Sequence, residues 1–137
     1  HPPSYPDGFD VEIFSFKALS KARFNAKKNF QKEHVTPYIW DNPDKFVIEN
    51  YWPHYIKKTL HNSYRLTLDY LEDFILIAKI YNVLYRKNKK FTFFDIMNFL
   101  KKNPKINKIN KRYIKVNWYG LYIKKLKTIN KNDTKLI

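Results

Sequence analysis

The segment 64–69 carries a cation, a hydroxyl and a carboxylate at alternate positions. Its apolar and polar residues alternate, and this period of two is typical of a β-strand with one packed face. Arg65, Thr67 and Asp69 therefore share the polar face of a predicted strand. From Leu71 onward the apolar residues recur at helical spacing. A strand that ends on a carboxylate and turns directly into a helix is a common place for an α/β protein to hold a ligand or a metal ion.

A second pair of carboxylates lies on another predicted strand, residues 9–14. Asp10 and Glu12 share the polar face of this alternating segment. Two neighbouring carboxylates on one face repel each other unless a cation, a metal ion or sugar hydroxyls lie opposite them. The alternative is an ordinary strand with a solvent-facing side, and the residue pattern leaves both interpretations open.

Asp69 also has two interpretations. Mg²⁺ suits oxygen ligands, usually takes one or two protein carboxylates, and shares its other positions with phosphates and water. The alternative is a structural N-cap of the following helix, with Glu72 three residues later completing a capping box. Residue patterns alone favour the N-cap. Glu33 and His34 lie just before the helix start predicted at Thr36. A histidine near a helix start is more often structural than catalytic.

Composition excludes several kinds of site. The chain has 137 residues, no cysteine and two glycines, Gly8 and Gly120. Without cysteine it has no disulfide and no thiolate metal site, which fits a reducing compartment, and we expect the cytoplasm. Two distant glycines cannot build a glycine-rich phosphate loop, and the four histidines lack the spacing of a zinc site. The apolar run 74–78 is far too short to cross a bilayer, so no membrane association is expected.

Charge divides the chain after residue 85. Residues 1–85 carry 11 Lys and Arg against 10 Asp and Glu, whereas residues 86–137 carry 16 against 2. A basic segment of this kind suits nucleic acid or another anionic surface, but a lysine-rich codon bias explains it as well, and nucleic acid is not the expected partner. We expect one domain, with residues 1–85 as its α/β part and residues 86–137 as a basic helical extension.

Local signals predict the helices. Ser15 and Thr36 are predicted N-caps. Thr92 and Asp95 form a capping box at the start of a helix that ends before Pro104. The predicted packing stripe of the helix after Asp69 consists of Leu71, Phe74, Ile75, Ala78, Tyr81 and Tyr85.

Three blocks of the sequence occur in the same order and rough spacing in a known family. They are YPDGFDVEIFSFKAL at 5–19, EHVTPYI at 33–39 and RLTLDYLED at 65–73. These blocks resemble the C-terminal half of cytidylyltransferases of the spore-coat-polysaccharide-biosynthesis type, relatives of the CMP-Kdo and CMP-acylneuraminate synthetases. The resemblance covers most of residues 2–126. One departure is Leu71, which stands where the family often has proline.

The resemblance implies an α/β fold, the C-terminal half of a Rossmann-like nucleotide-diphospho-sugar transferase domain with added C-terminal helices. It also implies an enzyme that couples CTP with an acidic sugar to make a CMP-sugar for surface polysaccharide. In that family the N-terminal half holds CTP, and the 137 residues alone are therefore expected to be inactive. A homodimer is implied as well.

The resemblance also assigns roles to individual residues. Asp69 matches the position of a Mg²⁺ ligand, and Arg65 is expected to act in catalysis by neutralising a phosphate or the sugar carboxylate. The residues expected to bind the sugar are Asp10, Glu12, Glu33 and His34. The alternative, drawn from the charge distribution, is a non-catalytic module that binds nucleic acid through its basic half or that only dimerises.

Overall fold

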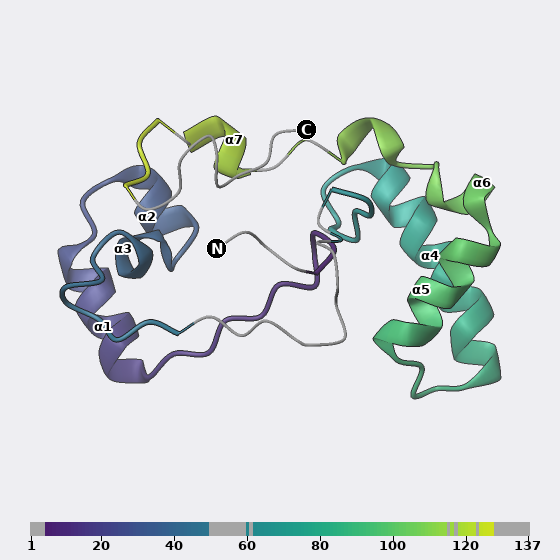
Figure 1. Ribbon diagram of the computed structural model, residues 1–137, viewed down its shortest axis with the longest axis horizontal. Coiled ribbons are helices and arrows are strands. Elements are labelled where there is room, and N and C mark those ends of the chain that lie inside the picture. Colours follow the sequence, from purple (N-terminus) through teal and green to yellow (C-terminus); the bar gives the residue numbers. More distant parts are fainter. Residues whose placement is uncertain are drawn as a thin grey trace. The chain divides into compact units, whose positions relative to one another are not determined.

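The computed structural model describes residues 5–49, 60, 62–114, 116, 118–122 and 124–127 (Figure 1). The chain forms two compact units, each assembled from segments that are distant in sequence. Of the described residues, unit 1 holds those within 11–57 and 117–137, and unit 2 holds those within 3–10 and 58–116.

Unit 1 is built from short helices. Its described helices are α1 (Phe16–Asn25), α2 (Asn29–Glu33), α3 (Pro37–Trp40) and α7 (Trp118–Tyr122). The predicted cap of α1 is confirmed, because Ser15 Oγ accepts a hydrogen bond from the amide of Ala18 at 3.1 Å. Helix α3 also begins where predicted, with Thr36 before Pro37. The Thr36 hydroxyl does not cap the helix and instead donates to Glu12.

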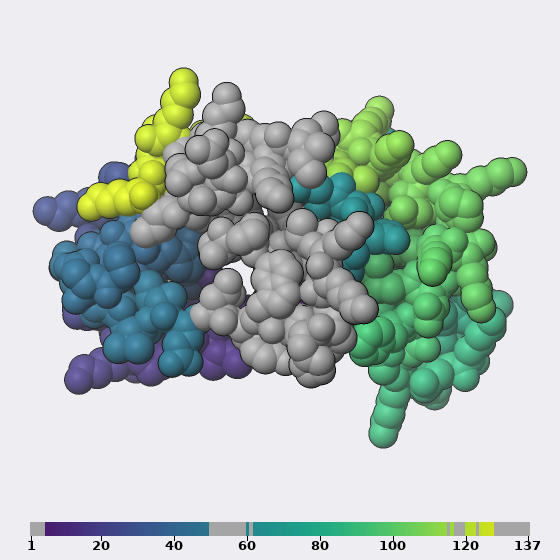
Figure 2. Space-filling view, viewed as in Figure 1, coloured from purple at the N-terminus to yellow at the C-terminus, as the bar shows by residue number. Residues whose placement is uncertain are grey.

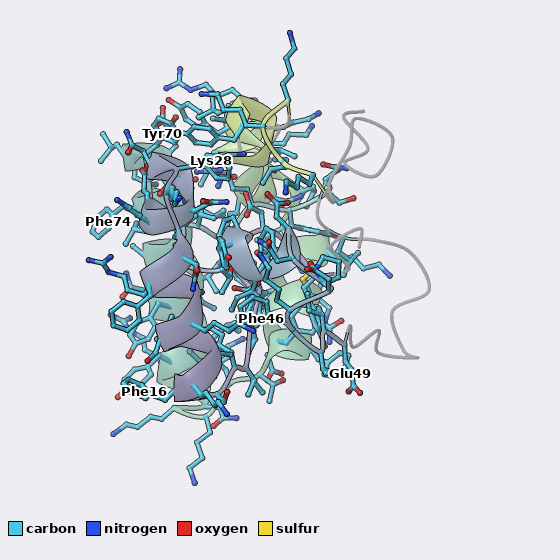
Figure 3. The ribbon with its side chains drawn as sticks, turned by 90° about the vertical axis from the view of Figure 1, so that its left-hand side faces the viewer. Phe16, Lys28, Phe46, Glu49, Tyr70 and Phe74 are labelled. Atoms are coloured by element: carbon cyan, nitrogen blue, oxygen red, sulfur yellow. The ribbon has the colours of Figure 1, made fainter. Side chains whose placement is uncertain are left out.

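Two small apolar clusters form the core of unit 1. The first joins α1 to α3 and contains Ala22, Ala26 and Tyr38. The second joins α2 to α7 through the stacked rings of Phe30 and Tyr122, whose centroids are 5.2 Å apart. Helix α1 therefore buries its alanines, while Phe16 at its start is exposed (Figure 3).

Unit 2 is a small helical assembly. Its described helices are α4 (Leu71–Lys87), α5 (Phe93–Lys102), α6 (Pro104–Asn107) and the short 3₁₀ helix η1 (Lys111–Tyr113). The predicted start of α5 is confirmed, because the amide of Thr92 donates to Asp95 Oδ2 at 2.7 Å and Thr92 Oγ1 accepts from the Asp95 amide. Helix α5 ends before Pro104, as predicted. No helix in the described ranges is long and apolar enough to cross a lipid bilayer.

Helix α4 packs with the face opposite to the predicted one. Leu76 and Ile80 are buried against Leu100 of α5, whereas Leu71 and Phe74 of the predicted stripe are 70% and 57% exposed. The helix is apolar on two sides, and periodicity alone does not decide which side meets α5. The predicted packing face of α4 is therefore wrong.

None of the described residues belongs to a β-strand ladder. Asp7 and Arg65 form an isolated parallel bridge, in which the Leu66 amide donates to the Asp7 carbonyl at 2.7 Å. Residues 9–14 have no β-bridge partner among the described residues, and Ile13 is 95% exposed. A segment without a neighbour cannot satisfy its backbone groups through a ladder. The strands predicted at 9–14 and 64–69 are not formed in the described chain, and the α/β class stays a prediction.

Candidate functional site

Arg65 is a buried cation in unit 2, with 2% of its side chain exposed. Its guanidinium contacts the carboxylates of Asp7, Asp69 and Asp73. Nη1 also donates to the carbonyl of Val116 at 2.7 Å. A buried guanidinium needs such partners, because an unpaired buried charge is costly.

Asp73 is fully buried and joins the guanidinium to the start of α4. Arg65 Nε and Nη2 each donate to the Asp73 carboxylate at 3.2 Å. The amides of Asp69 and Tyr70 both donate to Asp73 Oδ2 at 3.1 Å. The N-cap of α4 is therefore Tyr70, whose amide donates to the Asp73 carboxylate, and the predicted cap formed by Asp69 and Glu72 is wrong. The reason is that the Asp69 carboxylate contacts Arg65 instead.

Asn110 completes the buried network from the turn between α6 and η1. Its Nδ2 donates to Asp73 Oδ1 at 2.7 Å and to the carbonyl of Arg65 at 3.0 Å. Asn110 is 1% exposed, so both hydrogen bonds are shielded from water. The amide therefore ties the arginine, the start of α4 and the segment after α6 together.

The network determines the charge of its two central groups. Burial alone raises the pKa of Asp73, but hydrogen bonds from Arg65, Asn110 and two backbone amides outweigh it, and the net pKa lies below the ordinary aspartate value. Burial likewise lowers the pKa of Arg65, and its bonds to Asp73 and Asp69 outweigh that effect, so the net pKa is raised. Both groups are therefore ionised at neutral pH.

Asp69 is the exposed acid of the network, with 64% of its side chain exposed. Its Oδ2 lies 2.5 Å from Arg65 Nη2, and its amide donates to Asp73. These two contacts fix the residue at the start of α4. The structure thus brings together two of the predicted site residues, Arg65 and Asp69, and leaves the carboxylate accessible to solvent.

Glu12 and Asp10 have different partners. Glu12 lies in unit 1, where Thr36 Oγ1 donates to Oε2 at 2.6 Å and Trp40 Nε1 donates to Oε1 at 2.9 Å. Asp10 lies in unit 2 and accepts a hydrogen bond from the amide of Gly8 at 3.4 Å. The predicted common strand face of the two carboxylates is therefore not present.

Glu33 and His34 lie at the end of α2. Glu33 is exposed, and the half-buried imidazole of His34 meets the ring of Tyr122 edge-on, with centroids 5.8 Å apart. The following Val35 has a φ of 65°, a value that β-branched residues rarely adopt. Both residues belong to unit 1, as does Glu12, which accepts a hydrogen bond from Thr36, two residues after His34.

No group of three or more Asp, Glu or His side chains within the described ranges has the arrangement of a metal site. The three aspartates that meet in unit 2 surround the guanidinium of Arg65. Among the described residues, Asp69 therefore does not belong to a group of three or more such side chains that could bind one metal ion.

The predicted site omits Asp73 and Asn110, the two buried polar partners of Arg65. Asp73 has a recognisable signal, because it lies three residues after Tyr70, where an acidic side chain commonly accepts from the N-cap amide at a helix start. Asn110 has no such signal, because its partners lie 37 and 45 residues away in the chain.

No protein-family model matches the chain. An uncharacterised protein of Methanocaldococcus jannaschii is 41% identical to it over 104 residues, which are 75% of this chain and 41% of that protein. The chain thus spans about two fifths of the length of this relative. No solved structure matches the chain.

Proposed function

We propose that the chain is the C-terminal portion of a cytidylyltransferase that transfers CMP from CTP to an acidic sugar in the cytoplasm. The observation that carries the proposal is the Asp69 carboxylate, which is exposed and yet held by the buried Arg65. This pair lies in one of the three blocks that resemble the family. The nucleotide-holding part would lie outside the 137 residues, and the 41% share of the matched relative leaves room for one.

Asp69 could supply one protein carboxylate to the proposed Mg²⁺. Mg²⁺ takes one or two protein carboxylates and completes its coordination with substrate phosphates and water. Asp69 offers one exposed carboxylate, whose orientation is set by Arg65. When bound, the ion would supply charge stabilisation for the phosphates.

In this proposal Arg65 is a positioning residue. A guanidinium has five N–H donors. Nε donates to Asp73, Nη1 to Asp7 and the Val116 carbonyl, and Nη2 to Asp69 and Asp73. These bonds occupy all five N–H donors. A direct hydrogen bond from Arg65 to a phosphate, as expected from the sequence, would have to replace one of them. Arg65 would therefore act on the reaction through the position of Asp69.

The proposed reaction forms a bond between a sugar hydroxyl oxygen and the α-phosphorus of CTP and releases pyrophosphate. The resemblance assigns sugar-binding roles to Asp10 and Glu33, and both carboxylates are exposed and able to accept hydrogen bonds, Asp10 in unit 2 and Glu33 in unit 1. Glu12 would do the same, because each of its oxygens has a second lone pair beyond the bond that it accepts from Thr36 or Trp40. The resemblance assigns a sugar-binding role to His34 as well.

The test is pyrophosphate release from CTP, with Mg²⁺ and a panel of acidic sugars, by a polypeptide that joins these residues to the nucleotide-holding part. We expect Asp69→Asn to lower the rate by about 100-fold or more, since charge stabilisation of this kind has that magnitude. The matched control is Asp44→Asn in an exposed turn, which should leave the rate unchanged. Unchanged release by Asp69→Asn, or measurable release by the 137 residues alone, would contradict the proposal.

A nucleic-acid-binding module is the second candidate, and a specific surface favours it. The segment from the end of α5 to η1 presents exposed lysines and no acidic residue between positions 101 and 112. Side chains of this green segment extend outward in Figure 2. The lysines are Lys101, Lys102, Lys105, Lys108 and Lys111. For this candidate, affinity for single-stranded RNA must fall steeply as salt rises, and weak binding that does not respond to salt would exclude it.

A further inference from the structure

Unit 1 contains a small pocket between α1 and α2 (Figure 1). Its volume is about 270 Å³, and every residue that lines it belongs to this unit. An engineered apolar cavity of about 150 Å³ is large enough to hold benzene. The pocket of unit 1 therefore has room for an aromatic ring with a short acidic chain.

The apolar part of the pocket comes from one face of α1. Leu19 and Ala22 of the helix and Ala26 at its end recur at helical spacing. The side chains of the two alanines end at Cβ, so they leave a hollow that longer side chains would fill. Val35, which follows α2, adds a fourth apolar side chain. Such a lining favours the hydrocarbon part of a ligand and offers few hydrogen-bond partners to sugar hydroxyls.

Two cations line the same pocket. Arg23 comes from α1 and Lys32 from α2, and both are exposed. Within the described ranges neither of them forms a salt bridge with a carboxylate. The residues that line the pocket include no acidic side chain. Two cations from different helices with no carboxylate between them favour an anionic ligand.

Gln31 supplies a buried donor to the pocket. Its side chain is among the lining groups and the residue is 7% exposed. Its Oε1 accepts a hydrogen bond from the amide of Lys28 at 3.2 Å, while no hydrogen bond joins its Nε2 to another group in the described part of the chain. A buried amide donor without a partner costs free energy, and an oxygen of a ligand would satisfy it.

We propose that this pocket binds a small organic carboxylate with an apolar body, such as an arylacetate. The ring would occupy the hollow beside the alanines of α1, and the carboxylate would meet the two cations and the Nε2 of Gln31. An arginine guanidinium pairs well with a carboxylate, because two parallel N–H bonds match its two oxygens. The site is independent of the proposed enzymatic function, since none of the residues expected to bind the sugar lines it.

The turn after α2 holds Val35 in a strained conformation. Its φ is 65°, and the amide of Thr36 donates to the carbonyl of His34 at 2.8 Å, which closes a γ-turn of the rare positive-φ kind. Thr36 is buried and its hydroxyl donates to Glu12, so the turn is fixed from behind. Strain of this kind persists only where the surrounding structure enforces it, and it is concentrated at ligand sites. Here it holds an apolar residue at the pocket.

Alanine-methyl NMR of the 137-residue chain locates the ligand directly. Ala22 and Ala26 line the pocket, whereas Ala78 lies on α4 in unit 2. Titration with phenylacetate should shift the first two methyl signals in a saturable way and leave the signal of Ala78 in place. Acetate lacks the ring, phenylacetamide lacks the charge and glucuronate is an acidic sugar, so each should bind at least about 10-fold more weakly. No shift at Ala22 and Ala26, or equal affinity for phenylacetate and any of the three other probes, overturns the proposal.

Substitution of the cations separates the pocket from the general positive charge of the chain. Arg23→Gln combined with Lys32→Gln changes two exposed positions, so the fold should persist, and we expect the dissociation constant of phenylacetate to rise at least about 10-fold. The matched control combines Lys17→Gln with Lys27→Gln, which removes two exposed charges outside the pocket and should leave that constant unchanged. Equal weakening by the two double variants would show attraction to net charge alone and would overturn the proposed site, as would unchanged binding by both.

Discussion

The guanidinium of Arg65 is buried, and the Asp69 carboxylate that it contacts at 2.5 Å is exposed. The pair therefore links a buried cation in unit 2 to an exposed carboxylate at the start of α4. Asp73 and Asn110 hold the buried end of the pair, because Arg65 Nε and Nη2 donate to the Asp73 carboxylate and Asn110 Nδ2 donates to the Arg65 carbonyl and to Asp73. A carboxylate held in this way is oriented before any ligand arrives.

The first prediction concerns Asp73 and pH. Asp73→Asn should destabilise the chain by about 3–5 kcal/mol at neutral pH, because it leaves the buried Arg65 without its main partner. The folded-state pKa of Asp73 is below the unfolded value, so its contribution is complete above about pH 4 and is lost as the pH falls through the folded pKa. Urea unfolding at neutral and acidic pH measures this. An equal difference between the two proteins at both pH values would contradict the assignment.

The second prediction concerns Gly8. Its φ is +97°, and a Cβ there would lie 2.4 Å from the carbonyl carbon of Leu66. Gly8→Ala should therefore cost about 1–3 kcal/mol in the free energy of unfolding and weaken the contact between Asp7 and Arg65. The matched control is Gly120→Ala in α7, which should be neutral or stabilising by up to about 1 kcal/mol. Equal effects of the two substitutions in chemical denaturation would show that Gly8 is not constrained.

The third prediction concerns Asn110. Asn110→Asp keeps the shape of the side chain but places a second carboxylate against Asp73 Oδ1, where the amide donates at 2.7 Å. At neutral pH we expect a larger loss of thermal stability than for Asn110→Ala, because like charges repel strongly in a buried site. Lowering the pH should restore part of the stability of Asn110→Asp alone. A variant with wild-type melting behaviour at neutral pH would show that Asn110 does not donate to Asp73.

The fourth prediction concerns Glu12. Its carboxylate accepts hydrogen bonds from Thr36 and Trp40, so Glu12→Gln and Thr36→Val should each destabilise the chain by about 1 kcal/mol. Combining them should cost less than the sum, since they share one bond. Glu49→Gln, at an exposed position, serves as the control for charge removal. Additive losses in chemical denaturation would indicate that the bond between Glu12 and Thr36 does not contribute.

The local features of the fold could be predicted from the sequence. Ser15 and Thr92 cap their helices as expected because a cap depends on residues within one turn. The packing face of α4 could not be predicted from the sequence, because the helix is apolar on two sides and only the contact with Leu100 of α5 selects one of them.

The candidate site shows the same division. The sequence placed Arg65 and Asp69 on one face of a predicted strand and did not predict their ion pair, because the chain turns toward α4 between them; the capping role passes to Asp73 because the Asp69 carboxylate contacts Arg65. Asn110 is 45 residues from Arg65 and 37 residues from Asp73 in the sequence, and no local pattern predicts these contacts.

The claim that Asp69 binds the metal ion of CMP transfer is tested most directly by a change of ligand and metal together. Asp69→Cys should abolish pyrophosphate release with Mg²⁺ in the complete polypeptide, because Mg²⁺ prefers oxygen ligands, and Mn²⁺ or Cd²⁺ should restore part of it, because a thiolate prefers softer ions. These 137 residues contain no other cysteine to compete for the ion. Equal activity of Asp69→Cys and the parent with Mg²⁺, or no recovery with either softer ion, would contradict a role of Asp69 as the metal ligand.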